Sequence, residues 1–217
     1  MTKHLSFHLN LLAILLLAQP AYSLTVPQKK EQPVAKVLEQ EVFIKQIEPP
    51  LDERRKAQRK YKSPEYQKWL LDYRVDNLVS VILNPLLKQY AAAHGISAAP
   101  DEIEGCIRVV FADYPNKDKP TERKIIRALA EQEVIQWKVS GALYKQYGGP
   151  VIFQQANPFE PIGAYQKFLE EHEQHKAFVI FNPQLRQAFW KYFTADHDAI
   201  PPEQINYDLP WWLQKPK

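Results

Sequence analysis

The densest group of ionisable side chains in this 217-residue sequence lies in the segment LEEHEQHKAF, residues 169–178. His172 and His175 are three residues apart, and Glu171 precedes His175 by four, so on a helix all three side chains share one face. Two imidazoles at this spacing can bind zinc, but a catalytic zinc site needs a third protein ligand and an open position. No HExxH motif occurs. The pair therefore favours a solvent-exposed charged face, with a metal-dependent enzyme as the alternative.

The single cysteine, Cys106, is the other candidate for chemistry, and no internal disulfide can form. It falls between Ile103 and Ile107 on an apolar helical face, with no histidine near it in the sequence, which predicts a buried structural thiol. The segment YGGP lacks the Lys and Ser/Thr of a phosphate-binding loop, and no serine nucleophile elbow occurs. We therefore expect a protein that is not an enzyme and that uses no cofactor.

Aromatic residues make up 12% of the chain, and several of them surround the segment YGGPVIFQQANPF, residues 147–159. Two glycines and a proline predict an irregular backbone there. Most of the aromatic side chains should form core, but some could line a groove for extended apolar peptides, because rigid rings bind at a low cost in conformational entropy. The candidate peptide-binding residues are Tyr144, Tyr147, Phe153, Phe159 and Tyr165.

The elements that would position these residues are mostly helical. Apolar residues with helical periodicity predict helices over residues 63–83, 86–94, 121–147 and 162–176, and further helices that begin at residues 100 and 182. Pro85 has no donor N–H, so we expect it to kink or break the chain's helix after Leu83. Gly95 should end the resumed helix as a left-handed cap. The fold class predicted is mainly α, a helical bundle with a small N-terminal β-hairpin.

The expected hairpin lies in PVAKVLEQEVFIKQIEP, residues 33–49. This segment resembles the beginning of the SurA-type chaperone domain, the N-terminal, peptide-binding part of periplasmic parvulin-type folding factors. The residues that match its two strands are Val34, Ala35 and Val37, then Val42, Phe43 and Ile44. Where that family usually has glycine in the turn, this chain has Glu39-Gln40.

A second similarity covers VDNLVSVILNPLLKQYAAAHGISAAPDEIEGCI, residues 75–107, which is similar to the family's long helix, its Gly-Ile stop and its next helix. The resemblance spans residues 34–111 and continues more weakly to Tyr147. The family's glycine-rich isomerase domain has no counterpart, because the whole chain holds six glycines. The resemblance therefore implies a chaperone-like part without the isomerase.

The first residues predict export. Lys3, the apolar run LLAILLLA and the small residues of AYS have the layout of a secretory signal peptide, which we expect to be cleaved near Ser23. The run is shorter than the ~20 residues that span a bilayer, so no stable membrane span is expected.

The rest of the chain is expected to divide into a flexible lead (24–33), a helical domain with the hairpin (34–147) and a helical extension whose Pro- and Trp-rich tail packs on the body (148–217).

Charge limits the choice of partner. Removal of residues 1–23 takes away one lysine and lowers the formal net charge from +3 to +2, which does not favour nucleic acid. The basic run LDERRKAQRKYK predicts a solvated helix face; the alternative is a weak contact with an anionic surface, such as lipid headgroups, through Arg54, Arg55 and Arg59.

The sequence thus predicts an exported, non-catalytic, chaperone-like protein of the bacterial periplasm that binds unfolded or partner polypeptides. One alternative is a structural or accessory subunit of an envelope assembly with one fixed partner. Another is a metal-dependent enzyme that uses His172 and His175.

Overall fold

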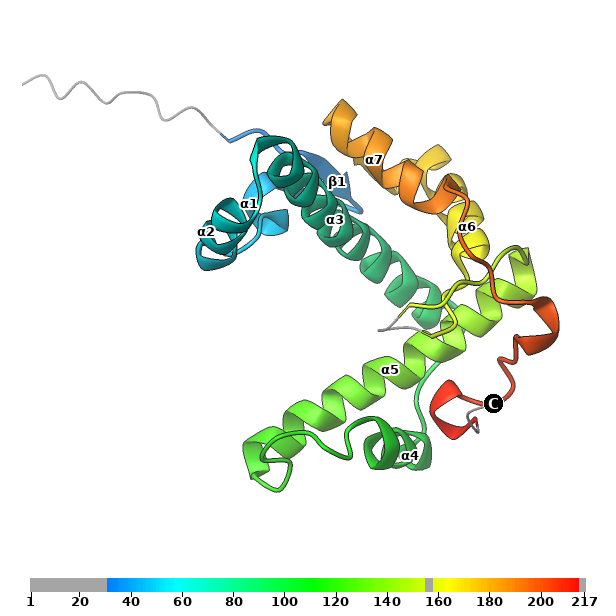
Figure 1. The fold of residues 1–217 in the computed structure, drawn as a ribbon. Coiled ribbons are helices and arrows are strands. Elements are labelled where there is room, and N and C mark those ends of the chain that lie inside the picture. The colour runs from blue at the N-terminus through cyan, green and yellow to red at the C-terminus, as the bar shows by residue number, and fades with distance from the viewer. Residues whose placement is uncertain (1–30, 155–157, 215–217) are drawn as a thin grey trace, which may run out of the picture. The chain divides into compact units, whose positions relative to one another are not determined.

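The computed structural model of the chain describes residues 31–154 and 158–214 (Figure 1). The expected signal peptide and most of the expected lead lie outside these residues. Helices dominate, and a small antiparallel sheet lies near the start of the described chain, so the predicted fold class is confirmed.

The described residues form seven α-helices, two short 3-10 helices and three strands. The helices are α1 (Ile44–Ile47), α2 (Leu51–Lys60), α3 (Ser63–Ala93), α4 (Pro100–Val110), α5 (Pro120–Tyr147), α6 (Ile162–Gln174) and α7 (Pro183–Thr194). The 3-10 helices are η1 (Pro202–Gln204) and η2 (Trp211–Leu213). The strands are β1 (Ala35–Val37), β2 (Gln40–Val42) and β3 (Phe178–Ile180).

Of the kink or break predicted after Leu83, the break does not occur, because helix α3 runs without interruption through Pro85. The proline removes one intrahelical hydrogen bond and costs roughly 3 kcal/mol. Leu83 and Leu86, on either side of it, are both buried in the same core, and this packing holds the helix together. The predicted cap is confirmed, because Gly95 has φ +62° and the Ile96 N–H donates to the Ala91 carbonyl.

The sheet has the order β2-β1-β3, and both pairs are antiparallel. The predicted hairpin supplies β1 and β2, but β3 comes from the far end of the chain and pairs Ile180 with Ala35. Leu38 occupies the turn with φ 50°, a left-handed conformation that costs a leucine about 1–2 kcal/mol. Its N–H donates to the Ala177 carbonyl at 2.6 Å, which fixes the turn against the start of β3.

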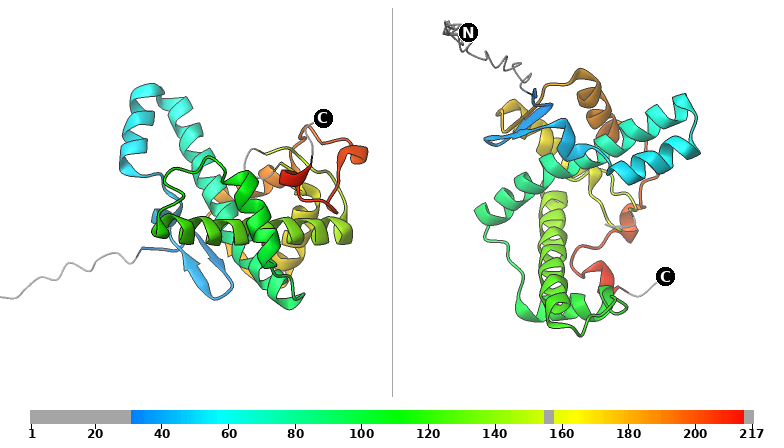
Figure 2. Two further views of the ribbon diagram at one scale, coloured as in Figure 1. Left: turned by 90° about the horizontal axis from the view of Figure 1, so that it is seen from below. Right: turned by 90° about the vertical axis from the view of Figure 1, so that its left-hand side faces the viewer.

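Two hydrophobic clusters hold these elements. The large cluster joins the sheet, α3, the second half of α5, α6 and α7, so Ile152, α6, β3 and α7 share one core with the N-terminal hairpin. The small cluster joins α4, α5 and the tail, and its buried members are Ile103, Cys106, Ala130, Val134, Trp137 and Trp212. Figure 2 shows α4 and the C-terminal tail beside the first half of α5.

Candidate functional site

The two histidines proposed for zinc are engaged with their own helix. The Nδ1 atom of His172 lies 2.8 Å from the Phe168 carbonyl oxygen, and that of His175 lies 2.7 Å from the Glu171 carbonyl oxygen. Within the described ranges, no group of three or more His, Cys, Asp or Glu side chains is arranged to hold a metal ion. The described residues therefore bring no third ligand to this pair.

Cys106 is buried in the small cluster, as its apolar neighbours predict. Burial, together with the nearby negative charge of Glu133, raises the pKa of the thiol to about 12. A thiol with this pKa stays protonated at neutral pH and is a poor nucleophile. The side chain acts as a small apolar packing group between α4 and α5.

The five aromatic residues predicted to bind peptide do not share one surface. Tyr165 is buried in the large cluster, and its hydroxyl shares a 2.7 Å hydrogen bond with Ser140. Tyr144 and Phe159 both pack against the ring of Tyr207, with ring centroids 5.2 and 6.4 Å from it. These three residues stabilise the fold, and Tyr165 has no surface to offer a ligand.

The other two predicted aromatic residues lie at the surface, but they differ in how much of the side chain is exposed. Tyr147 is half-buried, and its hydroxyl donates a 2.6 Å hydrogen bond to Glu171. Phe153 is 68% exposed, which is the highest exposure of any large hydrophobic residue in the described chain. Phe153 is therefore the member of the predicted set that remains available to another molecule.

Backbone hydrogen bonds to a buried residue, Glu160, hold the backbone next to Phe153. Ile152 and Glu160 exchange two backbone hydrogen bonds of 2.9 and 3.0 Å. Glu160 is 8% exposed, and the Tyr192 hydroxyl of α7 donates to its carboxylate at 3.1 Å. Burial raises the pKa of Glu160, although the Tyr192 hydrogen bond and the charge of His197 lower it in part. The loop that carries Phe153 thus begins from a rigid base.

A second surface feature comes from α5, which has apolar residues on two opposite faces. Ile126, Ala130 and Val134 are buried, the last two in the cluster that α5 shares with α4. The opposite face is buried in the large cluster at Val139 and Leu143, where α3 packs on α5. The Tyr90 hydroxyl of α3 donates a 3.1 Å hydrogen bond to the Gln146 side-chain oxygen of α5.

Towards its N-terminal end, this second face of α5 is uncovered. Residues 125, 129, 132, 136, 139 and 143 follow the three- and four-residue spacing of a single helical face. Ile125 is 46% exposed and Leu129 is 41% exposed, although Val139 and Leu143 on the same face are buried. We call Ile125, Ala128 and Leu129 the α5 strip; Gln132 and Gln136 separate it from Val139 and Leu143, which pack in the large cluster.

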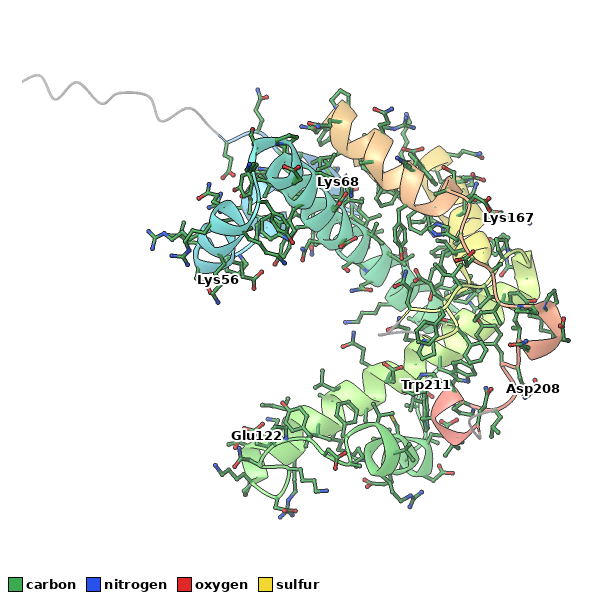
Figure 3. The ribbon with its side chains drawn as sticks, viewed as in Figure 1. Lys56, Lys68, Glu122, Lys167, Asp208 and Trp211 are labelled. Carbon is green, nitrogen blue, oxygen red and sulfur yellow. The ribbon has the colours of Figure 1, made fainter. Side chains whose placement is uncertain are left out.

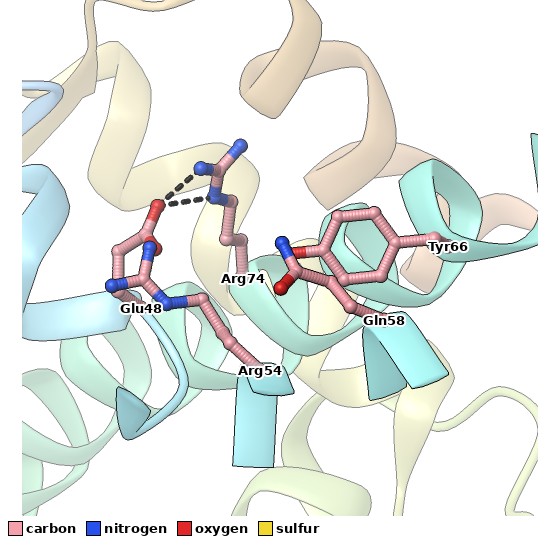
Figure 4. A network of polar contacts seen from close by, with 5 residues as sticks. All are labelled: Glu48, Arg54, Gln58, Tyr66 and Arg74. Carbon is pink, nitrogen blue, oxygen red and sulfur yellow. Dashed lines mark hydrogen bonds and ion pairs between the residues drawn. The ribbon is translucent and has the colours of Figure 1, made fainter. Parts of the chain in front are cut away.

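The α2–α3 hairpin carries the basic residues considered for an anionic surface. Arg54 donates to Glu48 at 2.7 Å, and Arg74 donates to the same carboxylate (Figure 4), so one of the three candidate arginines is held within the fold. Arg55 and Arg59 are exposed. Tyr66, Trp69 and Tyr73 form a half-buried row along α3, with successive ring centroids 5.9 and 5.8 Å apart.

The C-terminal tail covers the side of α5 opposite to the α5 strip. Trp212 is buried, and the Trp211 indole N–H donates to Glu133 of α5 at 3.2 Å. Figure 3 shows Trp211 against α5, with Glu122 at the start of that helix. The tail tryptophans are therefore packing residues and not a free surface.

Comparison of the chain with models of protein families, with curated proteins and with solved structures finds no match. Across residues 31–154 and 158–214, no helix combines the length and the apolar composition needed to cross a membrane. The functional argument therefore rests on Phe153, on the α5 strip and on the surfaces around them.

Proposed function

We propose that the chain is an exported, non-catalytic protein of the bacterial periplasm that binds unfolded or partner polypeptides in the manner of a chaperone. The observation that carries the proposal is the α5 strip, a group of exposed apolar side chains on the face of α5 that packs on α3 farther along the helix. Neighbouring exposed apolar side chains supply contact area on which another polypeptide can pack. The exposed ring of Phe153 adds a second apolar contact.

The resemblance of the N-terminal segment to SurA-type chaperone domains supports the same proposal, because those domains bind polypeptides. The layout of residues 1–23 supports export. N-terminal sequencing of the protein recovered from cells tests this part: we expect Leu24 at the mature end, and an intact Met1 on exported protein would contradict cleavage.

The functional test is suppression of aggregation, followed by light scattering as a chemically denatured client is diluted. Ile125→Gln/Leu129→Gln removes the apolar groups of the α5 strip and keeps good helix propensity. We expect this variant to suppress aggregation less than the wild type while its melting temperature stays nearly the same. The matched control is Leu51→Gln/Leu209→Gln, which changes two exposed leucines elsewhere and should behave as the wild type.

The alternative is a subunit with one fixed partner, for which the α5 strip would serve equally well. The two functions differ in selectivity. A wild-type protein that suppresses aggregation of no unfolded client, but elutes from envelope extract with one stoichiometric protein, would replace the chaperone proposal with the fixed-partner one.

A weak contact with anionic lipid headgroups is a lesser part of the proposal. It rests on Arg55 and Arg59, the exposed arginines of α2, because Arg54 is already paired with Glu48. Cosedimentation with phosphatidylglycerol vesicles should fall in Arg55→Gln/Arg59→Gln and be absent with phosphatidylcholine vesicles. Equal binding to both kinds of vesicle would contradict it.

A further inference from the structure

A hollow of about 720 Å³ opens between the second half of α4, the segment that follows it and the first turns of α5. Its volume falls within the range of about 300–1,000 Å³ that is typical of ligand sites. None of the residues predicted from the sequence as candidate sites lines it. It lies on the opposite side of α5 from Ile125, because its lining includes Ile126 and Arg127.

The rim of the hollow is cationic, and much of its charge is not neutralised by carboxylates. Arg123 donates through Nε and Nη2 to the Asp118 backbone carbonyl, at 3.0 and 2.8 Å. Lys117 donates to the Ala112 backbone carbonyl. These carbonyls hold the two cations in place but carry no net charge. Arg108 adds a third positive charge to the rim.

Two carboxylates also line the hollow. Glu104 forms a 2.6 Å ion pair with Arg127, and Asp118 lies beside the rim lysine and arginine. The lining as a whole holds four cationic and two anionic side chains. A ligand that fits this arrangement carries negative charge and also has hydrogen-bond donors.

The floor of the hollow is apolar. Ile126 is buried, and Ile107 and Phe111 are half-buried against the small cluster. An aromatic floor beneath a cationic rim favours an amphiphilic anion over a small hydrated one, because the apolar part of the ligand removes the exposed part of the Phe111 ring from water.

We propose that this hollow binds a polypeptide segment in which acidic and apolar side chains alternate. A carboxylate of the ligand meets Arg108, Lys117 and Arg123, and an apolar side chain packs on Phe111. Backbone N–H groups of the ligand donate to Asp118, a role that a phosphate without donors could not fill. This inference rests on the proposed function and goes beyond it, since it assigns a second polypeptide-binding site, with a charge preference, on the other side of α5 from the α5 strip.

The test is fluorescence anisotropy with the full mature chain and two fluorescein-labelled peptides, one of alternating Glu and Phe and one with Lys in place of each Glu. We expect the wild type to prefer the acidic peptide and to lose affinity as salt is raised. Arg108→Glu/Arg123→Glu should raise the Kd for the acidic peptide about tenfold, because two attractive charges become repulsive. The control Lys88→Glu/Lys191→Glu makes the same change of charge on α3 and α7 and should leave the Kd nearly unchanged.

Three outcomes would overturn the inference. They are equal affinity for the two peptides, equal loss of affinity in the control variant, and displacement of the acidic peptide by inorganic phosphate or phosphatidylglycerol vesicles at matched charge concentration. Thermal melts of the two charge-reversal variants show whether each is still folded. The Arg108→Gln/Arg123→Gln variant removes the charges without reversing them, and it separates loss of binding from loss of fold if the reversal unfolds the chain. A protein that suppresses client aggregation without charge preference overturns this inference alone, whereas one that suppresses no aggregation overturns the proposed function.

Discussion

The two hydrophobic clusters differ in how their parts of the chain are covered. In the large cluster, α3 is enclosed by the sheet, α5, α6 and α7, and the packing side chains include Phe168, Phe178 and Phe189. In the small cluster, α4 and the first half of α5 pack on each other on one side, and Trp212 of the tail is buried against them. Regions with fewer buried contacts open more readily, and binding surfaces are often drawn from them. The cationic hollow adjoins this small cluster, and the α5 strip lies on the other side of the same half of α5.

The largest loss of stability is expected from a substitution in the large cluster. Phe168 is fully buried and contacts the ring of Tyr90 edge-on, with centroids 5.8 Å apart. Phe168→Ala should cost about 3–5 kcal/mol of unfolding free energy, because it leaves a cavity among side chains from several elements. Urea unfolding followed by circular dichroism measures this. A loss below about 1 kcal/mol, as for a surface site, would break the distinction between the clusters.

A smaller and more local effect is expected from the small cluster. Trp212→Ala removes the ring that packs on Trp137, with centroids 6.2 Å apart. We expect a loss of about 1–3 kcal/mol, confined to α4 and the first half of α5. Hydrogen exchange should accelerate at the amides of α4 while those of α3 keep their protection. Equal acceleration in both helices would mean that the two clusters unfold as one unit.

Glu160 is a buried carboxylate that accepts a hydrogen bond from Tyr192, a residue packed against the large cluster, and it gives a pH test. Because burial raises the pKa of Glu160, the folded chain holds this proton more tightly than the unfolded chain does. Its contribution to stability is complete below the unfolded pKa and is lost as pH rises through the folded pKa. Glu160→Gln keeps an acceptor for the Tyr192 hydroxyl and does not titrate.

We therefore expect the wild type to lose more stability than Glu160→Gln between acidic and neutral pH. Melting temperatures of the two proteins across this range measure the difference. A wild type that gains stability relative to the variant as pH rises would show that the folded pKa lies below the unfolded one, against the burial of this carboxylate.

The smallest effect on stability is expected at Phe153. Since its ring is 68% exposed, Phe153→Ala should change the unfolding free energy by less than about 0.5 kcal/mol. We expect it to weaken suppression of client aggregation, because the exposed ring offers apolar contact. A marked drop in melting temperature would assign Phe153 to the core instead, and unchanged suppression would remove it from the proposed binding surface.

Much of the helical architecture follows from local residue patterns. Gly95 and Gly148 stop α3 and α5 where expected, because glycine takes the positive φ that a helix C-terminus requires. Pro85 shows the limit of such local rules, since burial of Leu83 and Leu86 outweighs the lost hydrogen bond. Strand β3 is a three-residue run of aromatic and β-branched residues, FVI, which is too short to identify as a strand by local pattern alone, and its partner β1 lies far away in the sequence.

The surfaces were harder to predict than the elements. The sequence predicts peptide binding for both Tyr165 and Phe153, yet one is buried and the other is exposed, because burial depends on which elements meet in space. In the same way, Ile125 and Ile126 both look apolar and helical. The sequence of residues 121–147 shows that α5 has two apolar faces. It does not show which half of a face stays exposed, because that depends on how far along α5 the helix α3 packs.

The pairing of β1 with β3 has a consequence for the order in which the chain can fold. The central strand of the sheet lies at the start of the described chain, and its second partner, Ile180, emerges from the ribosome only after α6 has been made. Until then one edge of β1 has open backbone hydrogen-bonding groups, a template for pairing with other chains. Contacts that are so distant in sequence slow folding. A nascent or truncated chain that lacks residues 178–180 is therefore expected to aggregate, and it would itself be a client for the kind of protein proposed here.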